Sequence, residues 1–279
     1  MRIRTLRADG AACVALADGR LARADRVLDG APSDLLSLLE AGALDALAAA
    51  VADGVADVAC VDPESAVGAP WIRPRKILGI GLNYGAHAGD LGEQAPRTSP
   101  ASFIKGDHTI VGPGEPIVVP PGIGRVTAEA EMGLVIGRTC FRVGIDEAMS
   151  YVAGVVPVLD QTAEEILLEN PRYLTRVKNY PTFLSFGPDL ITLDEVLARG
   201  PLSDLRVATV HNGAVHREDT VAGMTFSPAE LLSFHSQVMP FYPGDILSTG
   251  TPGAVPIVAG DVVGCELGDA FASLKNPVR

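Results

Sequence analysis

The fold that we expect is decided by the stretch Thr127-Ala128-Glu129-Ala130-Glu131-Met132-Gly133-Leu134-Val135-Ile136-Gly137. Alternate residues of a β-strand point to the same face, so Glu129 and Glu131 are expected to project together from an otherwise apolar segment. Two carboxylates held side by side at the edge of a core repel each other and lose solvation, and a divalent cation would relieve both costs. The alternative is a solvated strand face that carries two glutamates, which is common in antiparallel sheets.

The composition indicates a globular chain of 279 residues, long enough for one large domain or two small ones. Its net charge of -12 argues against nucleic acid or an anionic membrane as a partner, although a bound metal can still attract an anionic substrate. The four cysteines are widely spaced, so neither a disulfide framework nor a zinc site is expected. Without a signal peptide or a span-length apolar stretch, the chain is expected to be cytoplasmic.

Residues 1–70 are predicted to form a small structural α+β domain. Two short alternating segments flank the turn Asp9-Gly10, which predicts a hairpin. Helices are expected from Ser33 or Asp34, either of which suits an N-cap, and over Leu44–Val51. The region contains no histidine and no cluster of acid–base residues, so the catalytic residues are expected in residues 71–279.

From Lys76 onward the chain consists of short β-branched segments separated by glycine and proline. This pattern is typical of a β-rich α+β fold, either a sandwich or a barrel with a few helices. The strands that we expect are Ile77–Leu82, Thr109–Val111, Pro116–Val119, Glu131–Ile136 and Val152–Leu159, and the helices are Ile145–Tyr151, Ala163–Glu169 and Pro228–Gln237.

A third acid, Asp160, follows the apolar run Val155–Leu159. At the end of a buried strand it could join Glu129 and Glu131 in an oxygen-only site, which suits Mg²⁺, Mn²⁺ or Ca²⁺ better than Zn²⁺. The alternative is that Asp160 or Thr162 caps a following helix.

Three weaker signals accompany these acids. His87 and Asp90 are three residues apart in a glycine-rich loop, a spacing at which a carboxylate can orient an imidazole that activates water. Ser248–Gly253 combines hydroxyls with a glycine turn whose backbone N–H groups suit an oxygen ligand. Lys178 could bind a substrate anion, but each of these features is also compatible with an ordinary surface loop or a solvated charge.

The order of these motifs resembles that of the fumarylacetoacetate hydrolase family over about residues 74 to 279. The resemblance implies a mixed β-sandwich roll, usually dimeric, with Mg²⁺ or Mn²⁺ held by Glu129, Glu131 and Asp160. The motifs that carry it are Gly81-Leu82-Asn83-Tyr84 with His87, Phe103-Ile104-Lys105, Glu129-x-Glu131, Asp160, Lys178, His211-Asn212-Gly213, Ser248-Thr249-Gly250-Thr251-Pro252-Gly253 and Lys275-Asn276-Pro277-Val278.

The resemblance also implies roles for residues. His87 would lie on a lid and, with Asp90, activate water, while Lys178 would take part in catalysis and contact the substrate. The further substrate-binding candidates are Tyr84, Lys105, Glu164, Thr249, Gly250 and Thr251. Family members act on 1,3-dicarbonyl or 2-oxo acids, so the leading prediction is C–C bond hydrolysis. A decarboxylase, a keto–enol isomerase and an inactive binding protein are the alternatives.

Several positions depart from the family pattern. Asp90 replaces the usual glutamate after the lid histidine, and Thr127 replaces an acid two residues before Glu129. Glu164 stands where an arginine is usual, and Pro181 stands where an aspartate is usual. Because a cation is lost and a carboxylate gained, we expect a substrate less anionic than the usual diacid, and we expect Glu164→Arg to favour acylpyruvate-type acids.

Overall fold

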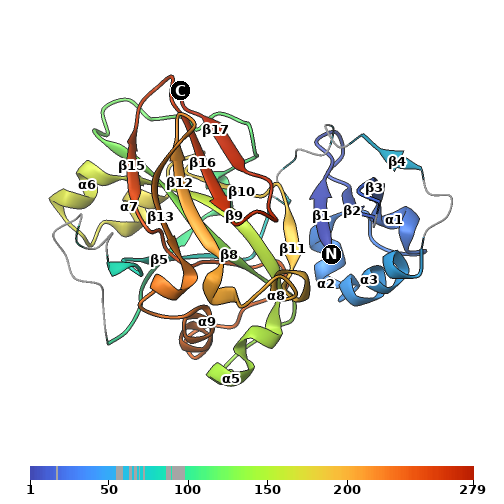
Figure 1. Cartoon of the computed structure of the whole chain (residues 1–279). Coiled ribbons are helices and arrows are strands. Elements are labelled where there is room, and N and C mark those ends of the chain that lie inside the picture. The colour runs from blue at the N-terminus through green and yellow to red at the C-terminus, as the bar shows by residue number, and fades with distance from the viewer. Residues whose placement is uncertain are drawn as a thin grey trace.

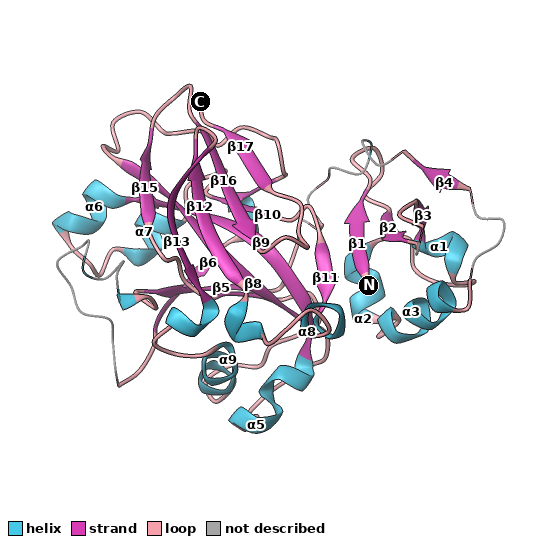
Figure 2. Ribbon diagram, viewed as in Figure 1, coloured by secondary structure: helices cyan, strands magenta, loops and turns pink. Residues whose placement is uncertain are grey.

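The computed structural model describes residues 1–16, 18–54, 59–62, 65, 68, 70–71, 73–85, 89 and 98–279. Within this part of the chain, two β-sheets pack against each other and short helices lie around them (Figure 1; Figure 2). The chain therefore has the β-rich α+β fold that its motifs predict. The strands of the larger sheet are β1 (Arg2–Thr5), β2 (Ala12–Ala15), β3 (Leu21–Arg23), β4 (Cys60–Val61), β5 (Ile77–Gly81), β6 (Ala101–Lys105), β7 (Ile110–Val111), β8 (Val126–Ile136), β9 (Val152–Ala163), β10 (Leu184–Phe186), β11 (Leu190–Thr192), β14 (Ile246–Ser248) and β15 (Ala254–Ile257).

The larger sheet runs in the order β4-β3-β2-β1-β11-β9-β8-β14-β5-β6, with β15 beside β8 and β10 beside β9. Strands that are far apart in the sequence, such as β8 and β14, are therefore neighbours in the centre of this sheet. The smaller sheet has the order β13-β12-β16-β17. Its strands are β12 (Arg206–His211), β13 (Ala214–Thr220), β16 (Val262–Leu267) and β17 (Leu274–Pro277).

The helices are short. None among the described residues is long and apolar enough to cross a lipid bilayer. The α-helices are α1 (Ala24–Val27), α2 (Leu35–Glu40), α3 (Leu44–Ala52), α5 (Ile145–Ala148), α6 (Glu164–Glu169), α7 (Leu174–Lys178), α8 (Leu193–Leu197) and α9 (Pro228–Ser236). The 3₁₀ helices are η2 (Asp107–Thr109), η3 (Met149–Tyr151), η4 (Leu202–Asp204) and η5 (Val221–Gly223).

β8 is the central strand of the molecule, and all of its residues are buried. One face contributes Ala128, Ala130 and Met132 to a core cluster that also contains residues of the smaller sheet. The other face carries the two glutamates and then Val135, which belongs to a second cluster. The predicted alternation is therefore confirmed. The apolar face of β8 packs against the smaller sheet, whose strands β12 and β16 contact β8.

The first 70 residues complete the core on the face that carries the glutamates. β1 pairs with β11 of the larger sheet, and Leu35 and Leu38 of α2 belong to the same apolar cluster as Val156 and Val158 of β9. On β9, Val156 and Val158 share a face with Asp160 because they lie four and two residues before it. The domain boundary near residue 70 remains a prediction, but the N-terminal helices pack into a core that this face of β9 also lines.

Most of the local predictions hold. β1 and β2 form the hairpin around Asp9-Gly10, and Asp34 caps α2 by accepting a 2.9 Å hydrogen bond from the backbone N–H of Ser37. The strand expected over Pro116–Val119 is wrong, because the structure has only an isolated bridge from Ile117 to Val278. Proline has no N–H to donate, which limits the ladder at both ends of this segment.

Gly133 allows β8 and β9 to approach closely beside the glutamates. A Cβ atom at this position would lie 2.7 Å from Cγ2 of Val158 and 2.9 Å from Cγ2 of Val156. We expect Gly133→Ala to lower the free energy of unfolding by about 1–3 kcal/mol, as overpacking of a core does. Urea unfolding measures this, with Gly81→Ala as the control because a Cβ there meets nothing within 4 Å. Equal stability of the two variants would contradict the packing argument.

Candidate metal centre

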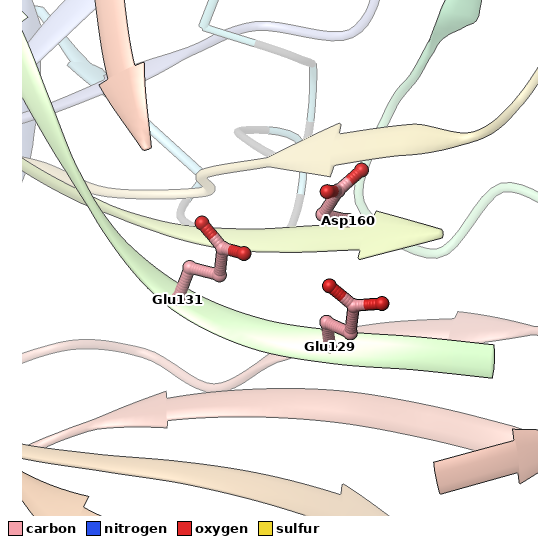
Figure 3. A group of neighbouring side chains, drawn as sticks. All are labelled: Glu129, Glu131 and Asp160. Carbon is pink, nitrogen blue, oxygen red and sulfur yellow. The ribbon is translucent and has the colours of Figure 1, made fainter. Parts of the chain in front are cut away.

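Three buried carboxylates meet where β8 and β9 run side by side (Figure 3). Glu129 lies directly opposite Asp160 in the antiparallel pairing, and Glu131 follows two residues further along β8 on the same face. One oxygen from each group lies within 4.8 Å of the others. Only 7% of Glu129 and 1% each of Glu131 and Asp160 is exposed, so these charges face each other with almost no water. Such a cluster requires compensating cations.

The donor set fits a hard divalent cation. Oxygen ligands at about 2.0–2.6 Å from Mg²⁺ or Ca²⁺ lie at most about 5 Å from one another, which these carboxylate oxygens satisfy. The described residues offer no sulfur or imidazole donor within this group. Burial first, and then the charges of Asp160 and Glu129, raise the pKa of Glu131 to about 8.

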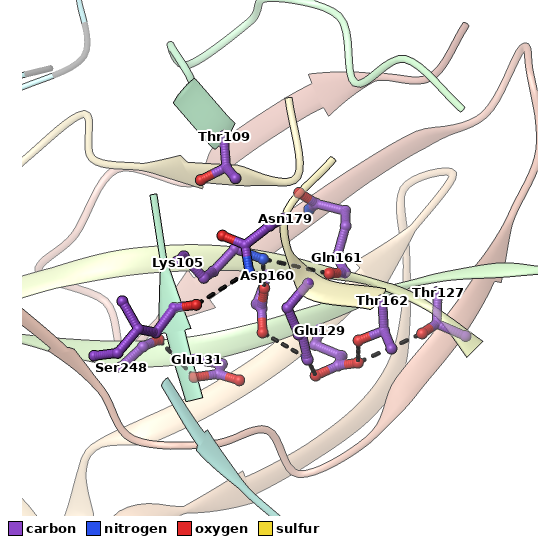
Figure 4. A network of polar contacts seen from close by, with 12 residues as sticks. Lys105, Thr109, Thr127, Glu129, Glu131, Asp160, Gln161, Thr162, Asn179 and Ser248 are labelled. Carbon is purple, nitrogen blue, oxygen red and sulfur yellow. Dashed lines mark hydrogen bonds and ion pairs between the residues drawn. The ribbon is translucent and has the colours of Figure 1, made fainter. Parts of the chain in front are cut away.

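Two lysines supply part of the counter-charge for these carboxylates. Figure 4 shows one of them, Lys105, beside the three carboxylates. Nζ of Lys178, at the end of α7, donates to Asp160 at 2.6 Å and to Glu129 at 3.0 Å. Nζ of Lys105, at the end of β6, donates to the other carboxylate oxygen of Asp160. Two ammonium groups face three carboxylates in this group, so one negative charge is left over when all five are ionised.

The environment keeps Lys178 protonated. Burial alone would lower its pKa, but the carboxylates of Asp160, Glu129 and Glu131 outweigh this effect and hold the pKa above the usual range. Nζ also lies 4.6 Å from the centre of the Phe103 ring, a cation–π contact. Phe103 can lie there because residue 79 is glycine, since a Cβ on Gly79 would come within 2.3 Å of the ring. For Lys105, burial is the larger effect and lowers the pKa.

Hydroxyl and amide donors fix the glutamates. Thr162 of β9 and Thr127 of β8 both direct their hydroxyls at the same oxygen of Glu129. Glu131 accepts from the hydroxyl of Ser248 and, at 2.9 Å, from the backbone N–H of Gly250. The Thr127 hydroxyl therefore contacts Glu129 at the position where the family usually has an acid.

The turn after β14 forms the wall beside Glu131. Gly250 adopts a φ of +94°, and a Cβ there would lie 2.9 Å from Cβ of Asn83, so glycine is required on both grounds. Asn83 donates to the carbonyl of Thr249 at 2.9 Å, which ties this turn to the segment after β5. The sequence-predicted turn thus presents its N–H group to a metal-ligand candidate.

The other predicted site residues are placed as follows. Thr249 donates its hydroxyl to the carbonyl of Met132, and Thr251 bonds within its own turn to Gly253, so neither hydroxyl contacts the carboxylates. Tyr84 is fully buried, and its hydroxyl has no partner among the described residues. Burial raises the pKa of Tyr84, so the phenol stays neutral. His87 and Asp90 lie outside the described residues.

Two alternatives from the sequence are wrong. Asp160 does not cap a helix, because β9 continues to Ala163, and Ala163 precedes α6 without a side-chain cap. Glu129 and Glu131 do not form a solvated strand face, because both are buried.

Sequence reasoning missed Arg125 and the role of Thr162. Arg125 forms an ion pair with Glu164, for which the sequence predicts substrate binding and a charge reversal but no partner. The alternation of side chains along a strand could have indicated both residues as neighbours of the carboxylates. Thr162 lies two residues after Asp160, and Arg125 lies four residues before Glu129.

The chain belongs to the fumarylacetoacetate hydrolase family. Residues 76–279 match the family model described as fumarylacetoacetate (FAA) hydrolase C-terminal. The resemblance inferred from the motifs is thereby confirmed, together with the family fold.

Individual relatives have related but different activities in their names. A 2,4-didehydro-3-deoxy-L-rhamnonate hydrolase from Sphingomonas sp. (strain SKA58) is 36% identical over 249 residues, which are 86% of this chain and 85% of that protein. A mitochondrial oxaloacetate tautomerase, Fahd2a, from Rattus norvegicus is 33% identical over 71% of this chain and 65% of its own length. The structure of maleylpyruvate hydrolase from Sphingobium sp. SYK-6, in complex with manganese (II) ion and pyruvate, matches with a TM-score of 0.80 and 26% identity, covering 100% of this chain and 98% of that one.

Proposed function

We propose that this protein is a divalent-metal-dependent hydrolase that cleaves a C–C bond in a 1,3-dicarbonyl or 2-oxo acid compound of the acylpyruvate type. The observation that carries the proposal is the buried group of Glu129, Glu131 and Asp160 with two lysines against it. The names of the relatives support the reaction class. Oxidation at positions 2 and 4 of a 3-deoxy acid describes a 1,3-dicarbonyl compound, and the Sphingomonas relative is named a hydrolase of it.

In this proposal Glu129, Glu131 and Asp160 hold Mg²⁺ or Mn²⁺, with Ca²⁺ as a further ion of the same ligand preference. When bound, such an ion acts as a Lewis acid and stabilises negative charge on the carbonyl oxygens of the substrate. A neighbour of this fold was solved with manganese and pyruvate, which supports the divalent ion and a 2-oxo acid ligand.

The chain's own residues contribute the rest of the reaction. Lys178 stays cationic and is close enough to two of the carboxylates to donate a hydrogen bond to a substrate oxygen in the same space. His87, oriented by Asp90, takes a proton from the water that attacks the carbonyl carbon. The N–H group of Gly250 and the hydroxyl of Ser248 keep Glu131 oriented, while Tyr84, Thr249 and Thr251 shape the pocket wall. We also propose that the protein acts in the cytoplasm as a homodimer.

The test is a metal-dependent assay of enol absorbance. The protein is treated with EDTA, supplied with Mg²⁺, Mn²⁺ or Ca²⁺, and offered acylpyruvates, fumarylpyruvate-like acids, oxaloacetate and neutral 1,3-diketones. The expected result depends on added metal: the enol absorbance is lost while one carboxylic acid and one ketone appear for each molecule consumed, the ketone being pyruvate when the substrate is an acylpyruvate. If no compound in the panel is hydrolysed to a carboxylic acid and a ketone with any of the ions, the proposal is wrong.

A second candidate function is keto–enol isomerisation, because the Rattus relative is named an oxaloacetate tautomerase. His87→Ala separates the two reactions. General acid–base catalysis contributes roughly 10²–10⁴-fold, so hydrolysis should fall by at least about 100-fold in this variant. Oxaloacetate tautomerisation, which needs no attacking water, should change less than the hydrolysis does. His216→Ala is the control, because His216 is exposed on β13 and bonds the carbonyl of Ala254. Retention of hydrolysis in His87→Ala would assign the water activation to another group.

A further inference from the structure

Arg125 and Glu164 form an ion pair, here called the rim pair, where β8 and β9 open toward solvent. Nε of Arg125 donates to a carboxylate oxygen of Glu164, the first residue of α6. The side chain of Arg125 is 51% exposed, but that of Glu164 is only 12% exposed. In the described part of the chain, the two terminal nitrogens of Arg125 make no further hydrogen bond. Its guanidinium therefore has donors available for a ligand.

The backbone around Arg125 is built to hold it in place. Glu165 accepts a 3.0 Å hydrogen bond from the backbone N–H of Arg125. Gly124 precedes it with a φ of +73°, and a Cβ there would lie 2.1 Å from a carboxylate oxygen of Glu165. Only glycine allows this arrangement. Two consecutive acids of α6 thus hold Arg125, one through its main chain and the other through its side chain.

The strand register relates the rim pair to the candidate metal centre. Glu129 lies opposite Asp160, and Thr127 lies opposite Thr162. Arg125 comes two residues before Thr127 and Glu164 two residues after Thr162, each just beyond the end of its strand. At roughly 3.3 Å per residue, the Cα of Arg125 is about 13 Å from that of Glu129. The order from the interior outward is carboxylates, threonines and rim pair. Exposure of the carboxylates also rises in this direction, from 1% at Glu131 to 7% at Glu129.

We propose that the rim pair determines specificity by accepting a neutral hydrogen-bonding group at the end of the substrate chain and by disfavouring a terminal carboxylate. This inference rests on the proposed function, because it assigns the end of the substrate that is distant from the metal. A hydroxyl or carbonyl group receives a hydrogen bond from Arg125 without changing the local charge. A carboxylate gains the same contact but also meets Glu164, which already neutralises Arg125.

The rim pair neutralises the carboxylate that stands at position 164 in place of the usual arginine. Glu164 is not an unpaired carboxylate, because Arg125, the residue before β8, compensates it. An arginine at position 164 would bring two guanidinium groups together, so Glu164→Gln is the sharper variant. It removes the charge, keeps the shape and leaves Arg125 as an uncompensated cation.

The experiment compares two 2,4-dioxo acids of equal chain length, one ending in a hydroxymethyl group and the other in a carboxylate. The native protein is expected to prefer the hydroxymethyl compound in kcat/KM. Since partly exposed charge pairs contribute modestly, Glu164→Gln should raise kcat/KM for the carboxylate compound by about fivefold and leave the other compound nearly unchanged. Arg125→Gln should lower kcat/KM for the hydroxymethyl compound. Glu169→Gln, an exposed glutamate of the same helix, is the control and should change neither value.

Calorimetric binding of the same two acids to the metal-loaded protein keeps the test independent of turnover. If neither acid is cleaved but Glu164→Gln still improves binding of the carboxylate compound, the proposed hydrolysis is wrong and the rim assignment holds. If cleavage occurs but Glu164→Gln and Glu169→Gln behave alike in both turnover and binding, the rim assignment is wrong. An improvement that persists at high salt would also contradict it, because the effect of a partly exposed charge is screened.

Discussion

Replacing Asp160 with asparagine is expected to abolish turnover and to remove measurable binding of Mn²⁺ or Mg²⁺. Asp160 of β9 lies opposite Glu129 of β8 and accepts hydrogen bonds from both Lys105 and Lys178. An asparagine would leave Lys105 and Lys178 facing each other with less negative charge, and its amide nitrogen cannot ligate a cation. Loss of such electrostatic stabilisation typically costs about 10²–10³ in kcat, and the loss of the ion adds to it.

The measurement is titration calorimetry with Mn²⁺, together with kcat on the best substrate of the panel. Asp269→Asn provides the matched control, because Asp269 is an exposed aspartate far along the chain from the site. Native-like metal affinity in Asp160→Asn would show that the ion binds elsewhere, and native-like turnover would show that Asp160 has no part in the reaction.

Replacing Lys178 with methionine is expected to destabilise the metal-free protein strongly. The ammonium group bridges Glu129 and Asp160, and all three side chains are buried. Removing one partner of a buried ion pair leaves an uncompensated charge, which costs about 3–5 kcal/mol. Saturating Mn²⁺ should restore part of that stability, because a ligand bound only by the folded state stabilises it.

Urea unfolding in EDTA and then in Mn²⁺ measures both effects. Lys275→Met is the control, since Lys275 of β17 is exposed and should unfold like the native protein in either condition. A loss of stability in Lys178→Met that is the same with and without Mn²⁺ would contradict the charge argument and would point to lost packing alone. Turnover should be lost in Lys178→Met at every metal concentration.

The carboxylate face was predictable because it follows from local geometry. The i, i+2 relation between Glu129 and Glu131 needs only the assumption of a strand, and the apolar residues between them support that assumption. The third carboxylate was predictable as a candidate only, since a strand end and a helix cap are equally plausible places for an aspartate. The structure decides between them because β9 continues past Asp160 to Ala163. The register that then brings Asp160 opposite Glu129 depends on the pairing of both strands and cannot be derived from either sequence segment alone.

The cationic partners were not predictable in their actual roles. Lys105 approaches Asp160 across 55 positions of sequence, and Lys178 approaches Glu129 across 49. Such contacts depend on the packing of α7 and β6 against β9, which no local pattern specifies. The same is true of β1 and β11, whose pairing joins residues about 190 positions apart, as Arg2 with Ile191.

The shared core between the first 70 residues and β9 bears on how this chain is divided for protein engineering. The match to the family begins at residue 76, yet Leu35, Leu38 and Leu47 belong to the same buried apolar cluster as Val156 and Val158 of β9. A fragment cut at the family boundary would expose Val156 and Val158 to solvent on the face that carries the three carboxylates. A chimera that exchanges this N-terminal segment must therefore preserve its apolar contacts, because the unit that folds is larger than the unit that the family shares.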